Sequence, residues 1–235
     1  MNLPRPSSES AESAAVPPPP WYRRCAQRVS LAWLFKAVGT TTFVTLFFWV
    51  YLHVLHNPSY AVTTMPTTAF DEWIGFRPQA FWLYASLWFY TSLPPALVES
   101  RRELIGYGVA IFAVCALGVA CFVAYPTAVP MFEIDWALHP SFAILKRVDT
   151  AGNAFPSLHV ATAVFSALWL DRQLRETGAG LVVRALSVLW CLGIVYSTMA
   201  TKQHVAFDVA GGLLLGLGLG WLSLRWVPAW VARPR

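Results

Sequence analysis

The chain has 235 residues, of which 57% are hydrophobic and only 12% charged, and its mean hydropathy is +0.51. Soluble domains carry roughly 25% charged residues, so the composition excludes an ordinary soluble protein and indicates a membrane protein. The formal net charge of +5 comes from Lys and Arg residues scattered through short loops between apolar runs. This scatter excludes a nucleic-acid-binding face and is typical of membrane topology.

The N-terminal segment, residues 1–22, is rich in Pro, Ser, Ala and Glu and contains four consecutive prolines. Such a composition buries too little apolar surface to offset the chain entropy lost on folding. We therefore predict a disordered cytoplasmic tail. The first apolar run begins near Leu31, which is too late for a cleavable signal peptide, and residues 23–235 are expected to form one membrane domain.

Several apolar runs approach the roughly 20 residues that a helix needs to cross a bilayer. We predict an all-α integral membrane protein built as a six-transmembrane-helix bundle. The expected spans are residues 31–56, 80–98, 104–125, 157–174, 181–199 and 205–227. The last span contains a glycine-rich run, 211–220, whose small residues permit close helix packing.

An even number of spans places both termini on the same side of the membrane. With the termini in the cytoplasm, only Arg77, Lys146, Arg147 and Lys202, of 17 Lys and Arg residues, lie outside. The excess of positive charge inside favours this orientation. We expect a multi-pass protein of a bacterial-type inner membrane, with the polar clusters described next on the outer, periplasmic face.

The first polar cluster, Asn153–His159, leads into the fourth span. Pro156 disfavours helical geometry at Phe155, and Ser157 is a good N-cap residue. His159 would then lie in the first helical turn, beside backbone N–H groups that have no acceptor within the helix. Helix N-termini of this kind bind anions, and phosphate is a suitable ligand.

The second cluster runs from Ser197 to Asp208. His204 and Asp208 are four residues apart, so on a helix they share one face, and the carboxylate can fix the tautomer of the imidazole. The other ring nitrogen is then available as a nucleophile or base. Because no serine stands in a nucleophile-elbow context, His204 itself would attack phosphorus. Each pattern alone also occurs in structural helices, but ionisable groups at membrane depth are usually functional.

These residues resemble the second and third signature motifs of the type 2 phosphatidic acid phosphatase superfamily: Pro156-Ser157-Leu158-His159, then Ser197, His204 and Asp208. The resemblance covers roughly residues 71–227 and implies a six-helix membrane bundle. It also implies that His204 forms a phosphohistidine, Asp208 orients it and His159 protonates the leaving group. Ser157 would help to hold the phosphate.

The sequence departs from the family pattern in its basic residues. The first motif, a Lys followed seven residues later by Arg-Pro, is missing near the end of the third span, and Thr198 replaces the Arg of the third motif. Basic residues on the outer side must supply that charge. Our order of candidates is Lys202, then Lys146 or Arg147, then Arg77. The predicted substrate-binding set is Ser157, Lys202, Lys146, Arg147, Ser197 and Asn153.

Three functions remain open at this point. Hydrolysis of a lipid phosphate or diphosphate comes first. Transfer of a phospho-headgroup to a lipid alcohol is second, because the pattern from Ser197 to His204 resembles the branch that contains inositol phosphorylceramide synthases. A non-catalytic membrane protein is third. We expect a lipid substrate in the bilayer, no nucleic acid, and neither cofactor nor metal, since the four cysteines lack metal-ligand spacing. The oligomeric state is open.

Overall fold

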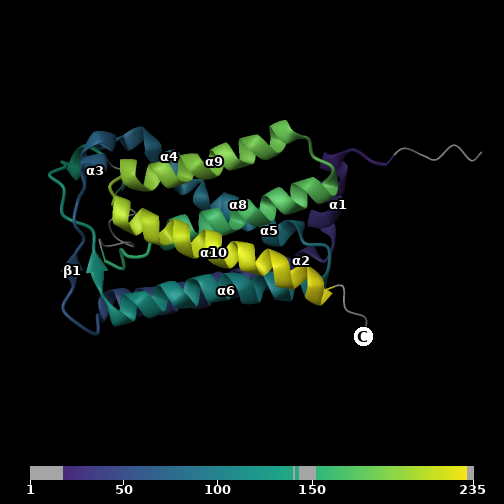
Figure 1. The fold of residues 1–235 in the computed structure, drawn as a ribbon, viewed down its shortest axis with the longest axis horizontal. Helices are drawn as coiled ribbons and strands as arrows, with labels where there is room; N and C mark the ends of the chain where they lie inside the picture. The colour runs from purple at the N-terminus through teal and green to yellow at the C-terminus, as the bar shows by residue number, and fades with distance from the viewer. Residues whose placement is uncertain (1–17, 140, 143–151, 232–235) are drawn as a thin grey trace, which may run out of the picture.

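A computed structural model describes residues 18–139, 141–142 and 152–231, and Figure 1 shows their arrangement as a bundle of long helices. The α-helices are α1 (Trp21–Ser30), α2 (Trp33–His56), α3 (Ala69–Ile74), α4 (Phe81–Ala85), α5 (Leu87–Leu97), α6 (Arg101–Ala124), α8 (Leu158–Thr177), α9 (Leu181–Ala200) and α10 (Ala206–Val231). Two single-turn helices, η1 (Pro78–Ala80) and η2 (Trp136–Leu138), and a two-residue parallel strand pair, β1 (Thr63–Thr64) with β2 (Thr127–Ala128), lie in the connections.

Four of the described helices, α2, α6, α9 and α10, are long and apolar enough to cross a membrane. The expected span 80–98 is instead divided into α4 and α5 at Ser86, and α5 contains Pro94 and Pro95. Helix α8 carries Asp171 and Arg172 among the charged residues of its last turns, which lowers its hydropathy. The all-α membrane bundle is therefore confirmed, whereas six crossings remain a prediction.

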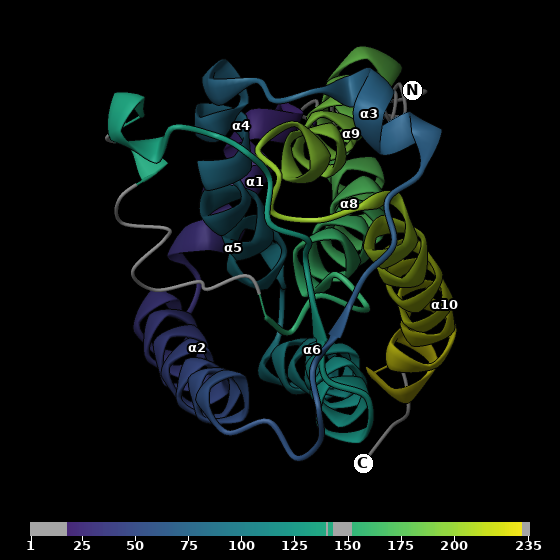
Figure 2. The same cartoon turned by 90° about the vertical axis from the view of Figure 1, so that its left-hand side faces the viewer.

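Helix α8 is the centre of the bundle. It packs against α5, α6, α9 and α10, which surround it when the bundle is viewed end-on in Figure 2. Trp169, Phe165 and Val160 of α8 are fully buried, so the middle of this helix is enclosed by protein. Ring contacts from Tyr107 of α6 to Phe165 and Trp169 join α8 to its neighbour.

The closest helix packing joins α10 to α8 through the glycine-rich run. A methyl group built on Gly212 would lie 2.5 Å from the carbonyl oxygen of Ser157, and one built on Gly216 would lie 2.5 Å from that of Ala161. Because only hydrogen atoms fit there, both positions need glycine. The close packing expected for residues 211–220 is confirmed.

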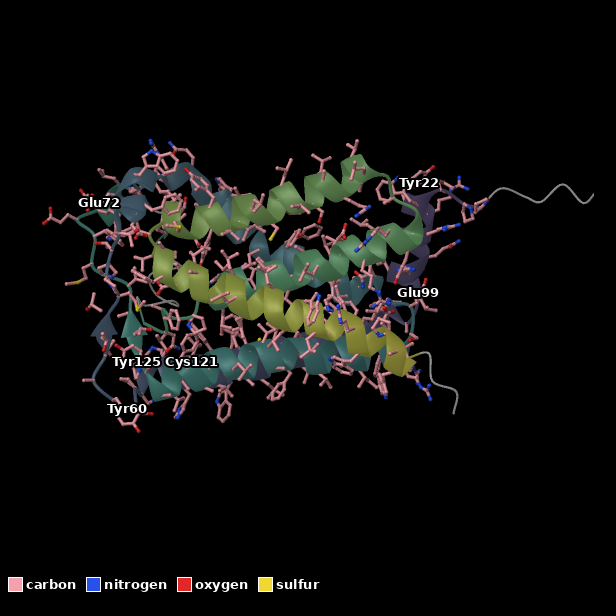
Figure 3. All side chains as sticks on the ribbon, viewed as in Figure 1. Tyr22, Tyr60, Glu72, Glu99, Cys121 and Tyr125 are labelled. Atoms are coloured by element: carbon pink, nitrogen blue, oxygen red, sulfur yellow. The ribbon has the colours of Figure 1, made fainter. Side chains whose placement is uncertain are left out.

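The end of the bundle that carries α1 contains several ion pairs. Helix α1 begins at Trp21, inside the expected limit of the tail, and lies at the same end as the C-terminal end of α10, on the right in Figure 1. There Arg28 pairs with Glu99 and Glu176, and Arg172 pairs with Glu103. Figure 3 shows Glu99 at this end, and Glu72 at the opposite end with α3.

The α8–α10 contact generates a prediction with a control on the same helix. Gly216→Ala should lower the free energy of unfolding by about 1–3 kcal/mol, because the added methyl group overpacks the backbone of Ala161. Gly218→Ala should not, because a methyl group there meets no atom within 4 Å. Thermal unfolding in detergent measures both. Equal stability of the two variants would refute the close contact.

Candidate active site

The start of α8 is fixed by Ser157, whose hydroxyl accepts a hydrogen bond from the backbone N–H of Val160 at 3.2 Å. The predicted N-cap is confirmed. The Ser157 N–H donates to the backbone oxygen of Asp208 at 3.0 Å, which ties the first turn of α8 to that of α10. His159 follows one residue into α8, at the end of the bundle where α10 also begins.

Two carboxylates fix the start of α10. Asp208 accepts from the backbone N–H of Val205 at 3.1 Å, and Asp71 accepts from that of Ala206 at 2.8 Å. Asp71 is itself held in a capping box with Thr68 at the start of α3. The turn that carries His204 therefore has its position set from both α3 and α10.

These constraints bring the two predicted histidines into contact. The Nδ1 atom of His159 lies 3.2 Å from the Nε2 atom of His204. The other ring nitrogen of His159, Nε2, lies 2.8 Å from the hydroxyl of Tyr84 on α4. His204 is 6% exposed and Asp208 is fully buried. The three residues of the predicted catalytic set thus lie together, and Tyr84 contacts His159 on the side away from His204.

The His204–Asp208 contact is looser. The Nδ1 atom of His204 is 3.5 Å from Oδ2 of Asp208, which exceeds hydrogen-bond length. Among the described residues, neither that nitrogen nor Oδ1 of Asp208 has a hydrogen-bond partner. A small rotation of the imidazole would close the bond, and catalytic hydrogen bonds commonly tighten only when substrate binds.

The four side chains allow one consistent direction of hydrogen bonding. If His204 directs its Nδ1–H toward Asp208, its Nε2 is unprotonated and accepts from Nδ1–H of His159. The Nε2 of His159 is then also unprotonated and accepts from the Tyr84 hydroxyl. In this arrangement the unprotonated Nε2 of His204 holds the hydrogen bond from His159, and its lone pair could act as a nucleophile only when that bond is broken.

An apolar cavity of about 550 Å³ begins at the histidine pair. Its polar end is lined by His159, His204, Tyr84 and Asn153, and its remaining walls come from α2, α5, α6 and α8. Asn153 is buried, and its amide donates to the backbone oxygen of Tyr51 at 3.2 Å. The histidines therefore face a space suited to hydrocarbon.

Other members of the predicted substrate-binding set lie elsewhere. Ser197 is fully buried, its hydroxyl donates to the backbone oxygen of Ile194 at 2.6 Å, and it does not line the cavity. The side chain of Arg77, which is only the last cation candidate and not a member of that set, is exposed. Lys146 and Arg147 lie outside the described residues.

Lys202 is in the turn before α10, with φ of 56°. Its ammonium donates to the backbone oxygen of Asp71 at 2.7 Å and lies 5.0 Å from the ring centre of Phe132. Burial lowers the pKa of Lys202, while the Asp71 carboxylate acts in the opposite direction. Lys202 is therefore close in sequence to His204 but is held toward α3, and it does not line the cavity.

Tyr84 and Asp71 are the two site residues that the sequence analysis missed. The Thr68-x-x-Asp71 spacing is a capping-box pattern, so a helix start at this position was detectable. Tyr84 stands in the aromatic run Phe81-Trp82-Leu83-Tyr84, where nothing separates it from its neighbours. Among the described residues, no group of three His, Cys, Asp or Glu side chains could hold a metal ion.

Comparison with known proteins identifies the family of this chain. No curated protein and no solved structure matches the chain. The sequence profile of the PAP2 superfamily matches residues 77–232, which is more than half of the chain and contains His159, His204, Asp208 and Tyr84. This superfamily includes lipid phosphatases and related phosphotransferases, and its members are typically phosphatases. The membrane bundle with a histidine pair at the starts of two helices is thus a member of the PAP2 superfamily.

Proposed function

We propose that the protein hydrolyses the phosphate or diphosphate of a membrane lipid through a phosphohistidine on His204. The observation that carries this proposal is the 3.2 Å contact of His159 Nδ1 with His204 Nε2 at the polar end of an apolar cavity. Family membership supplies the reaction class. The cavity supports a substrate with a hydrocarbon chain, and the histidines mark where its phosphate would react.

The reaction proceeds in two steps. The substrate phosphoryl group displaces the hydrogen bond between the two rings, which move apart to admit it. His204 Nε2 then attacks phosphorus while the bond from phosphorus to the lipid oxygen breaks. His159 gives its Nδ1 proton to that oxygen, and the lipid alcohol leaves. Water then attacks the phosphohistidine, His159 Nδ1 takes the proton of the water, and the bond from nitrogen to phosphorus breaks to release phosphate.

Tyr84 serves His159 in both steps. An anionic phosphate beside His159 favours its doubly protonated form, in which Nε2–H donates to the Tyr84 oxygen. In the resting site the Tyr84 hydroxyl donates to that nitrogen instead. Since a phenol can donate or accept, the 2.8 Å contact holds the ring in place throughout the cycle. Tyr84 is therefore a positioning residue.

The charge on the transferring phosphoryl group must be balanced by cations or N–H donors. Ser157 is our candidate for one part of this balance through its hydroxyl hydrogen, since its N–H already donates to Asp208. Lys202 is our first candidate for the cation, because its ammonium has three donors and, within the described part of the chain, one of them bonds to the backbone oxygen of Asp71. Lys146 or Arg147 is the second candidate, and Arg77 the third.

We place the histidine end on the outer face of a bacterial-type inner membrane and both termini in the cytoplasm. Helix α1 and the C-terminal end of α10 lie at the end opposite the histidines. Arg23, Arg24 and Arg28 in α1 bring basic side chains to that end. The excess of Lys and Arg there supports the orientation.

Replacement of His204 by Asn should lower phosphate release from a radiolabelled lipid phosphate by about a thousandfold or more, because it removes the nucleophile. The control is His53→Asn, which alters an exposed histidine of α2 away from the site and should leave turnover unchanged. If the His204 variant keeps full activity, the histidine pair is not catalytic. The same assay with a lipid alcohol added separates hydrolysis from transfer. If the label appears only in this acceptor, the reaction is transfer and not hydrolysis.

Tyr84→Phe should lower kcat roughly three- to tenfold with little change in KM, because one hydrogen bond of about 0.5–1.5 kcal/mol is lost while the ring shape is kept. The matched control is Tyr90→Phe, which removes the hydroxyl bonded to Ser187 at 3.1 Å, away from the cavity. The pH profile of kcat should shift for Tyr84→Phe alone. If both variants have the same kcat and the same pH profile, Tyr84 does not position His159.

A fluorescent protein fused after Arg235 should fluoresce in the cytoplasm, and an alkaline phosphatase fused after Asn57, the C-cap of α2, should be active outside. Both results follow from one orientation of the bundle. A dark fluorescent protein at Arg235 together with an inactive alkaline phosphatase at Asn57 would invert the topology and place the histidines in the cytoplasm.

A further inference from the structure

The cavity is a long groove rather than a headgroup-sized pocket. Its lining includes residues of α2 from Phe35 to Tyr51, a stretch of about 24 Å at the helical rise of ~1.5 Å per residue. Half of a bilayer's hydrocarbon core measures only about 15 Å. The groove therefore extends beyond the depth of one leaflet.

Helix α2 forms the wall of this groove because it is attached near its two ends. Near the cytoplasmic end the Lys36 ammonium donates to the backbone oxygens of Arg28 at 2.6 Å and Ala96 at 2.8 Å. Near the outer end Tyr51 packs on Phe122. Only Lys36 and Tyr51 of α2 are buried. Between these two attachments Phe48 also contacts Trp88 of α5, with ring centroids 5.3 Å apart, and other side chains of this stretch line the groove.

The groove is open to lipid along its side. Val44 on α2, Trp88 on α5 and Ile105 on α6 all line it, and they are 36%, 51% and 52% exposed. In a membrane, apolar side chains that face such a space contact hydrocarbon chains. A chain attached to the reacting phosphate would thus enter sideways and lie in the groove, with its phosphate at the histidines.

Two glycines leave room deep in the groove. Gly39 on α2 and Gly108 on α6 line it, and a Cβ atom built on either meets no atom within 4 Å. Gly39 lies about 18 Å along the helix from Tyr51. The helices do not need these glycines for packing, unlike Gly212 and Gly216 of α10. Their effect is to keep the deep part of the groove wide.

We propose that the groove holds one hydrocarbon chain of the phosphorylated substrate, and that its deep part, at Gly39 and Gly108, selects chains long enough to pass the bilayer midplane. Helix α2 lies outside the segment that matches the PAP2 superfamily. The match to the superfamily therefore does not itself assign this groove. This inference rests on the proposed function, since it takes the phosphate at the histidines as the anchor of the chain.

Steady-state phosphate release from octyl phosphate and octadecyl phosphate tests the proposal. An octyl chain ends before Gly39, whereas an octadecyl chain passes it. The wild-type protein should show a higher kcat/KM for octadecyl phosphate. Gly39→Leu and Gly108→Leu should each lower kcat/KM for octadecyl phosphate about tenfold or more, with a much smaller effect on octyl phosphate.

Gly218→Leu is the matched control. Gly218 also has open space around it, but it lies exposed on α10 and does not line the groove. This variant should keep the chain-length preference of the wild-type protein. Two results for the Gly39 and Gly108 variants would overturn the proposal. One is an equal loss of kcat/KM for both substrates. The other is no loss for either substrate, which would leave bulk membrane lipid as the occupant of the groove.

Failure of the proposed function gives a different result. If the wild-type protein releases no phosphate from any lipid, the hydrolase proposal fails while the groove is still testable by binding. Calorimetry of octadecyl phosphate with the His204→Asn variant, with and without Gly39→Leu, then decides. Weaker binding in the doubly substituted protein supports the groove, and equal binding contradicts it.

Discussion

The backbone contact between α8 and α10 is the constraint on which the site depends. Gly212 and Gly216 allow α10 to approach the carbonyl oxygens of Ser157 and Ala161, a contact that a single methyl group would prevent. The same approach lets the N–H of Ser157 donate to the backbone of Asp208. Because both helices begin at this contact, their first turns place the histidines side by side.

Several polar groups in this contact both stabilise the fold and form part of the site. The Asp208 carboxylate accepts from Val205 N–H and lies against His204, so capping α10 also directs the carboxylate toward the imidazole. Asp71 joins α3 to the first turn of α10 and accepts the Lys202 ammonium on its backbone oxygen. A change in either carboxylate would therefore alter helix geometry and site chemistry together.

The sequence predicted the features that depend on local pattern. The bounds of α6, α8, α9 and α10 follow the apolar runs closely, and Ser157 is the N-cap. His204 and Asp208 lie near each other, although His204 is in the turn before α10 and the two residues do not share a helix face as expected. Motif order also pointed to His159 as the partner of His204. These features depend on residues adjacent in sequence or one helical turn apart, or on a family pattern.

Features that depend on tertiary packing were not predictable. Tyr84 reaches His159 from α4, which packs mainly against α9, and an aromatic run gives no sign of which ring faces inward. The division of span 80–98 lies at Ser86, whose hydroxyl donates to the backbone oxygen of Leu83 at 2.6 Å, and composition alone does not resolve it. Lys202 is two residues from His204 in sequence, but a positive φ and the Asp71 carbonyl hold it toward α3. The groove behind α2 requires the spacing of three helices.

The most direct test of the account is chemical trapping of the intermediate. Protein stopped under alkaline conditions during turnover of a lipid phosphate should carry a phosphoryl group on His204, identified by mass spectrometry of the peptide that contains it. The group should be lost on mild acid treatment, as expected for a bond from phosphorus to nitrogen. A phosphoryl group on Ser157, or steady turnover with His204 unmodified at every time point, would contradict the account.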